Sequence, residues 1–186
     1  MYWFNTYLKR SALTYSLALA LLMCAAACRP QIKGQQGSKV YFDLKGYFKN
    51  DSARLAKLHP LINKTVGHNG ATQTKNVYID NWGSEFELFT SSDINKPAWQ
   101  QSYDVKKNDS MLVYSAKLPG LKTRQIVIKR SGNRIKSITI FNHTKNVLYE
   151  NTEKLSYFPD SVYLIEKTQQ VKLLGKNTYT IKGVFR

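Results

Sequence analysis

The sequence predicts an α+β fold, in which a curved antiparallel β-meander of about six to eight strands is packed by one or two N-terminal helices. Three observations support this fold class. Apolar residues recur at helical spacing over residues 41–58. From residue 111 to the end, almost every segment has the composition of a strand. Short polar breaks separate these segments, which is typical of consecutive strands that pair antiparallel.

The first predicted helix covers residues 41–58. Leu44, Phe48 and Leu55 lie on one helical stripe, and Pro60 ends the segment because proline cannot continue a helix. Next, residues 61–80 are predicted to form a β-hairpin. Its turn is Asn69-Gly70, a pair that favours the positive φ angles of a type I′ turn.

A second helix is predicted over residues 81–92, with Asp80 or Asn81 as its N-cap. Residues 93–105 are expected to connect this helix to the strands. Five aromatic residues fall in these two segments, and their spacing fits a buried core better than a ligand groove: Trp82, Phe86, Phe89, Trp99 and Tyr103.

The remaining strands are predicted from alternating or continuous apolar runs bounded by turn residues. Ile126-Val127-Ile128 is apolar on both parities, so either both faces of the sheet are partly covered or the sheet curls. The predicted ranges are 111–117, 124–130, 134–141, 147–158, 162–173 and 178–185.

The N-terminal segment has the pattern of an export signal. Lys9 and Arg10 precede an apolar run at 13–23, and small residues follow that run. A positive flank, a short apolar stretch and small residues are typical of a secretory signal. The run is shorter than the roughly 20 apolar residues of a spanning helix.

Ala25-Ala26-Ala27-Cys28 resembles the lipobox of bacterial lipoproteins. The resemblance implies a signal peptide at 1–27, lipidation of Cys28, and attachment to a membrane by that lipid. Polar residues at 28–38 are then a flexible tether, and 39–186 a single α+β domain. Cys24 is a second candidate anchor, while a plain cleaved signal or an uncleaved helix remain alternatives. The resemblance covers the signal region alone.

The charge of the chain is strongly positive. It has 28 basic and 12 acidic residues, and removal of Lys9 and Arg10 with the signal leaves a net charge of +14. No acidic residue occurs between Ser110 and Tyr149. The functional interpretation of this stretch is a surface for anionic lipid, lipopolysaccharide or an acidic glycan; the alternative is a solvated face. The candidate anion-binding residues are Arg124, Lys129, Arg130, Arg134 and Lys136.

No catalytic, metal or cofactor pattern stands out in the sequence. The histidines, His59, His68 and His143, have no metal-ligand spacing, and both cysteines lie in the signal region. No nucleophile elbow or phosphate-binding glycine loop occurs. We therefore expect no enzyme activity, no cofactor, no metal site and no nucleic-acid partner.

Three Asp-Ser pairs, each followed by an apolar residue, resemble a short O-glycosylation sequon that one gut-associated Gram-negative phylum uses on exported proteins. The candidate acceptors are Ser52, Ser110 and Ser161. The alternative explanation is the ordinary preference of Asp-Ser for turns and helix caps.

The leading functional hypothesis is a non-catalytic, lipid-anchored protein of the cell envelope, on the periplasmic face of the outer membrane, that binds an envelope protein or an anionic envelope component. The first alternative is a carrier for an apolar ligand in a half-open β-barrel. The second is an envelope hydrolase whose carboxylates come from separate segments.

Overall fold

The structure is a computed structural model that describes residues 40–186. The predicted signal peptide, the tether and the predicted lipidation site Cys28 lie outside the described residues. Among the residues described, no helix is long and apolar enough to cross a bilayer.

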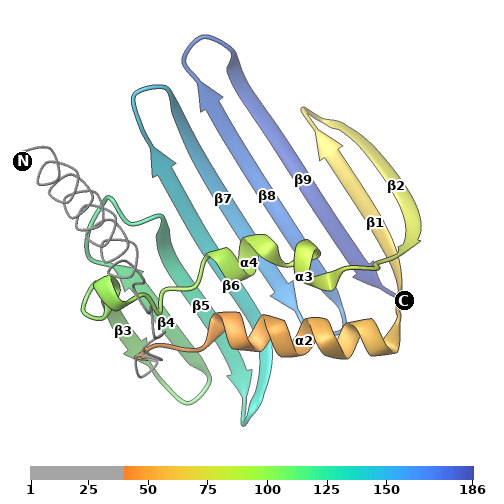
Figure 1. Ribbon diagram of the computed structural model, residues 1–186, viewed down its shortest axis with the longest axis horizontal. Helices are drawn as coiled ribbons and strands as arrows, with labels where there is room; N and C mark the ends of the chain where they lie inside the picture. The colour runs from red at the N-terminus through yellow and green to blue at the C-terminus, as the bar shows by residue number, and fades with distance from the viewer. Residues whose placement is uncertain (1–39) are drawn as a thin grey trace, which may run out of the picture. The chain divides into compact units, whose positions relative to one another are not determined.

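A single open sheet of nine antiparallel strands forms the frame (Figure 1). Its order is β2-β1-β9-β8-β7-β6-β5-β4-β3, so β1 pairs with the last strand and the rest of the sheet is a meander. The α+β prediction is confirmed. The strands are β1 Leu61–His68, β2 Ala71–Tyr78, β3 Tyr103–Lys107, β4 Met111–Ala116, β5 Thr123–Ser131, β6 Arg134–Lys145, β7 Tyr149–Phe158, β8 Val162–Val171 and β9 Gly175–Phe185.

Helix α2, Leu44–Leu58, begins and ends with local caps. The Asp43 side chain accepts a hydrogen bond from the Gly46 N–H at 2.9 Å. At the other end His59 adopts a left-handed conformation, and its N–H donates to the Leu55 carbonyl directly before Pro60. The predicted helix is thus confirmed, starting three residues later than expected.

The second predicted helix is divided into two short ones, α3 Trp82–Glu85 and α4 Glu87–Ser91, with Phe86 between them. Asn81 caps α3 through its side chain, as one of the two candidate caps. A 3₁₀ turn, η1, follows at Pro97–Trp99.

Strand β3 is the one strand that the sequence pattern missed. Its first residue, Tyr103, fell inside the predicted connector, and Asp104, Lys106 and Lys107 give it a polar composition. It is a strand because it pairs with β4, from Tyr103 opposite Ala116 to Lys107 opposite Leu112. The structure therefore has nine strands rather than six to eight.

The helices lie across one face of the sheet (Figure 1). Phe48 of α2 packs against Phe86 and Phe89, with ring centroids 5.2 and 4.8 Å apart, and against Tyr157 of β7 at 5.2 Å. All four side chains are fully buried. Trp82 and Tyr103 are also buried and Trp99 is partly so, which confirms that the predicted aromatic cluster is core. On the opposite face, Val127 is only half-buried.

Gly183 of β9 lies directly opposite Tyr163 of β8, and the tyrosine ring crosses the glycine. A Cβ on residue 183 would overlap the Cε1, Cζ and Oη atoms of Tyr163. The ring cannot move freely, because its hydroxyl donates to Glu85 at 2.6 Å and its body is buried.

We expect Gly183→Ala to lower the free energy of unfolding by about 1–3 kcal/mol, through overpacking of this ring. Urea unfolding followed by circular dichroism measures it. Gly120→Ala is the matched control, because a Cβ at Gly120 meets no atom within 4 Å. A loss of stability no larger than that of the control would show that the ring does not require the glycine.

Candidate functional site

Three of the five predicted anion-binding residues converge on one hollow. Lys129, Arg130 and Lys136 line a space of about 390 Å³ at the ends of β5 and β6. No acidic side chain is among the residues that line it. The other lining residues come from the turn before β4 and from the first residue of that strand: Asn108, Ser110 and Met111.

A β-bulge brings the basic residues together. Lys129 pairs with Ser137, whereas the next residue, Arg130, pairs with Ile135, so that Lys136 is an extra residue between the two pairs. In a regular hairpin, successive side chains point to opposite faces. A bulge changes the direction of its side chains, which explains how neighbouring residues line the same hollow.

The opposite wall of the hollow is held by a tight polar turn. The Asn108 carbonyl oxygen Oδ1 accepts hydrogen bonds from the backbone N–H groups of Ser110, at 3.0 Å, and Met111, at 2.7 Å. The Arg130 N–H donates to the Ser110 carbonyl at 2.8 Å, which joins this wall to β5. The turn is therefore fixed relative to the basic strand ends.

Arg130 is the half-buried member of the basic set. Its Nε atom is buried and has no hydrogen-bond partner within the described part of the chain. Its positive charge also reaches Tyr114: burial raises the pKa of that phenol, while the Phe42 N–H and the charge of Arg130 oppose the rise. Lys129 and Lys136 are exposed. The hollow is thus lined by one half-buried guanidinium and two exposed lysines.

Arg124 and Arg134, the other two candidates, lie elsewhere. Arg124 donates to the Leu118 carbonyl and lines a different hollow of about 370 Å³ over β6, β7 and β8. That hollow is mixed in charge, because Lys154 and Glu166 line it as an ion pair 3.5 Å apart. Arg134 is exposed at the start of β6, opposite Ser131. The five residues are not one site.

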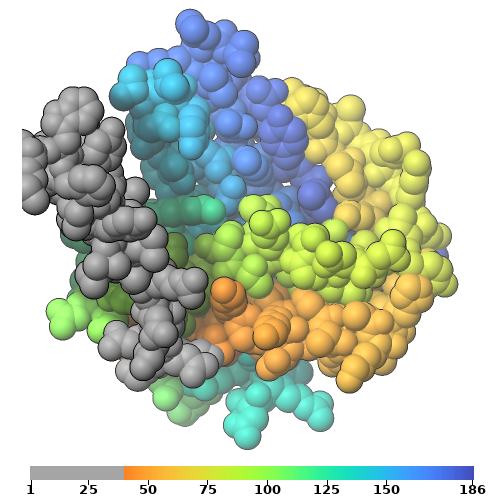
Figure 2. Space-filling view, viewed as in Figure 1, coloured from red at the N-terminus to blue at the C-terminus, as the bar shows by residue number. Residues whose placement is uncertain are grey.

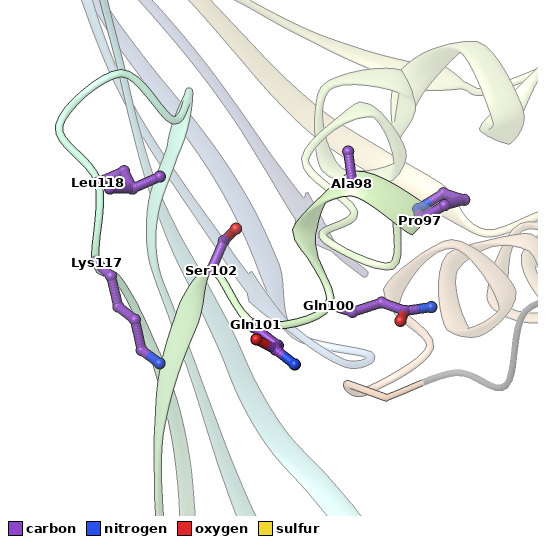
Figure 3. Close-up of a pocket in the computed structure, with 7 residues that line it drawn as sticks. All are labelled: Pro97, Ala98, Gln100, Gln101, Ser102, Lys117 and Leu118. Atoms are coloured by element: carbon purple, nitrogen blue, oxygen red, sulfur yellow. The ribbon is translucent and has the colours of Figure 1, made fainter.

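A third hollow, of about 400 Å³, lies between η1 and the end of β4 (Figure 3). Its polar groups are mainly the amides of Gln100 and Gln101 and the hydroxyl of Ser102. Its one charged residue, Lys117, lies 3.7 Å from Asp104, so the charge is partly neutralised. This hollow offers little attraction for an anion.

The buried carboxylates are engaged in structural contacts. Asp51 accepts a hydrogen bond from the Tyr157 hydroxyl and pairs with Arg54 at 2.7 Å, and Arg54 also pairs with Asp160 at 2.7 Å. Asp51 and Asp160 therefore converge on one guanidinium, which pairs with both carboxylates. Within residues 40–186 no group of three or more His, Cys, Asp or Glu side chains could hold a metal ion.

Two further acidic side chains also accept hydrogen bonds or ion pairs from neighbouring residues. Glu85 accepts from the Tyr163 hydroxyl at 2.6 Å and from Lys64 at 2.7 Å. Glu153 accepts from the amides of Asn142 and Asn151, at 3.1 and 2.9 Å. A glycosidase that uses two carboxyl groups needs one that can move a proton and a second on the other side of the scissile bond. Glu85 and Glu153 instead accept hydrogen bonds from neighbouring side chains.

The three candidate glycosylation sites differ in access. Ser110 and Ser161 are exposed in turns that directly precede β4 and β8, whereas Ser52 is half-buried on α2. Ser110 lies on the wall of the basic hollow.

Asn108 also lines the basic hollow, and sequence reasoning did not predict it. The only signal in the sequence was the turn composition of Asn108-Asp109-Ser110.

Comparison of the chain with models of known families, with curated proteins and with solved structures finds no match. Function must therefore be inferred from the chemistry of the chain itself.

Several buried tyrosines make the fold sensitive to alkali. Burial raises the pKa of Tyr103 to about 12, and raises those of Tyr157 and Tyr163 further, aided by hydrogen bonds to Asp51 and Glu85. In the unfolded chain these phenols ionise near pH 10. Their contribution to stability is complete below that pH and is lost as the pH rises through 10 toward 12, because the folded state resists ionisation.

We expect the free energy of unfolding to fall above about pH 10, by up to about 1.4 kcal/mol per pH unit for each such tyrosine. Tyr103→Phe should make this decline shallower, while costing about 1 kcal/mol at neutral pH through loss of the hydrogen bond to the Thr123 carbonyl. Urea unfolding between pH 7 and 11 measures both. Tyr179→Phe, at an exposed position, is the control; an equal slope in the two variants would contradict the assignment.

Proposed function

We propose that this protein is a non-catalytic, lipid-anchored protein of the cell envelope that binds a phosphate-bearing envelope component in the hollow lined by Lys129, Arg130 and Lys136. The observation that carries the proposal is the convergence of three cations on one hollow that has no acidic residue in its lining. The lipobox-like segment at Cys28 supports attachment by a lipid, and the location that we propose is the periplasmic face of the outer membrane.

Phosphate suits these groups for physical reasons. An arginine guanidinium has five N–H donors in a planar fork that matches phosphate oxygens, and lysine adds a mobile point charge. Arg130 is half-buried beside the two exposed lysines, and no hydrogen bond or ion pair engages its guanidinium within the described residues. The positive charges of the two exposed lysines would attract an anion as it approaches and raise its association rate.

Glycosylation of Ser110 and anion binding in the basic hollow exclude one another. A glycan on its hydroxyl would stand on the wall of the hollow and obstruct the basic residues. Ser161 lies in the β7–β8 turn, does not line the hollow, and can carry a glycan without this conflict. We therefore favour Ser161 as the modified serine in protein that binds an anion.

The alternatives receive less support. A carrier for an apolar ligand needs a continuous apolar cavity, and the sheet face under α2, α3 and α4 is filled by fully buried aromatic side chains. An envelope hydrolase needs paired free carboxylates, and the buried carboxylates of the described chain are hydrogen-bonded or ion-paired.

The binding proposal predicts that the triple variant Lys129→Gln, Arg130→Gln, Lys136→Gln binds purified lipopolysaccharide at least about tenfold more weakly, because each lost cation removes a charge-assisted contact. Isothermal titration calorimetry at two salt concentrations measures the affinity. Binding should also weaken as salt rises, since the rim charges are exposed.

The matched control removes three exposed lysines from α2 instead: Lys45→Gln, Lys49→Gln and Lys57→Gln. Both variants lose the same net charge. Enzymatically dephosphorylated lipopolysaccharide serves as the ligand control. Equal losses of affinity in the two variants would show that only the net charge matters. Undiminished binding of the dephosphorylated ligand would exclude phosphate recognition.

The proposed lipid anchor at Cys28 is tested separately. Intact mass spectrometry of protein extracted from its native membrane should show a chain that begins at Cys28 and carries acyl groups, and Cys28→Ala should abolish the acyl mass. Additional hexose-type mass that disappears with Ser161→Ala would establish the glycan. A soluble, unacylated chain with another first residue would refute the lipid anchor.

A further inference from the structure

The four most exposed large apolar side chains of the described residues all lie in two hairpin turns. Val147 and Leu148, in the β6–β7 turn, are 76% and 69% exposed; Leu173 and Leu174, in the β8–β9 turn, are 96% and 80% exposed. Isolated exposed aliphatic residues are common in soluble proteins. Four together, each more exposed than any other large apolar residue described, call for an explanation.

The two turns adjoin one another. The Lys172 N–H donates a hydrogen bond of 3.1 Å to the Leu148 carbonyl, so the backbones of the turns are in direct contact. Both turns project beyond α3 and α4 at the same end of the strands (Figures 1 and 2). We call Val147, Leu148, Leu173 and Leu174 the aliphatic tip.

Lysines surround the aliphatic tip. Lys145 ends β6, and Lys172 and Lys176 flank the β8–β9 turn. Lys145 pairs with Glu150 at 3.0 Å, whereas Lys172 and Lys176 are exposed. The tip therefore combines protruding aliphatic side chains with a positive rim.

We propose that the aliphatic tip inserts into the interfacial region of a lipid bilayer that contains anionic lipids. Aliphatic side chains that protrude from a turn can enter the acyl boundary without desolvating a strand edge, because the turn backbone can remain at the headgroup level. The lysines would stay among the headgroups, where each is attracted by negative surface potential. This surface is distinct from the basic hollow, and the inference does not depend on what the hollow binds.

The charge of the tip also argues against a second copy of this chain as its occupant. Two tips packed together would bring Lys172 and Lys176 of both copies close to one another, and like charges would oppose the contact. A negatively charged bilayer satisfies the apolar residues and the lysines together.

The arrangement of β6 gives the inference a geometric consequence. Lys136, near the start of this strand, lines the basic hollow, and Lys145 at its end lies beside the aliphatic tip. The strand has twelve residues and so extends about 40 Å at about 3.4 Å per residue. A bilayer at the tip would leave the hollow facing away from that membrane, open to a component in the aqueous space.

The test places a fluorescent reporter in the tip. Full-length Leu173→Trp protein is mixed with vesicles of anionic phosphatidylglycerol and brominated phosphatidylcholine, whose bromine atoms quench tryptophan within the bilayer. The control is Leu58→Trp, since Leu58 is also strongly exposed, at 61%, but lies at the end of α2. The native tryptophans contribute equally to both proteins.

We expect quenching of the added tryptophan to be at least twofold stronger in Leu173→Trp than in Leu58→Trp. The further changes Lys172→Gln and Lys176→Gln should reduce that difference, whereas the triple variant of the basic hollow should leave it unchanged. Quenching at position 173 no stronger than at position 58 would overturn the inference. Quenching that is unchanged by Lys172→Gln and Lys176→Gln would overturn the role assigned to anionic lipid. Failure at the tip would leave anion binding in the hollow intact, so the two proposals are separable.

Discussion

The contact of Phe48, Phe86 and Phe89 with Tyr157 is the interaction on which the rest of the structure depends. It joins α2, the α3–α4 region and β7, three segments that are far apart in the chain, through rings with centroids about 5 to 6 Å apart. An antiparallel sheet with one apolar face requires a cover, and these rings supply it. Large buried aromatic surfaces also contribute more stability per residue than other side chains do.

Polar contacts give that apolar packing a unique geometry. The Tyr157 hydroxyl reaches Asp51 on α2, and the Tyr163 hydroxyl reaches Glu85 on α3. Each tyrosine therefore contributes its ring to the core and its hydroxyl to a contact between a helix and the sheet. Asp51 and Glu85 are thereby engaged in contacts that join α2 and α3 to the sheet.

The two proposed binding surfaces lie at opposite ends of the sheet. The aliphatic tip lies in the β6–β7 and β8–β9 turns, whereas the basic hollow lies beside the β5–β6 hairpin and the turn between β3 and β4. One end has the basic hollow of Lys129, Arg130 and Lys136, and the other has the aliphatic tip. Taken together, the two proposals describe a sheet that would hold one envelope component at a distance from a bilayer.

The sequence by itself determined the fold class, because hydrophobic periodicity and turn residues are local signals. The 41–58 stripe, the Asn69-Gly70 turn and the meander after residue 111 each depend on neighbours within a few positions. The basic character of residues 111–149 was equally visible. Only tertiary structure decided the ninth strand, since β3 is polar and exists through its pairing with β4. It also decided which cations share a site: the bulge at Lys136 and the turn at Asn108 assemble three of the five candidates, and Arg124 and Arg134 are directed elsewhere by strand register that composition does not encode.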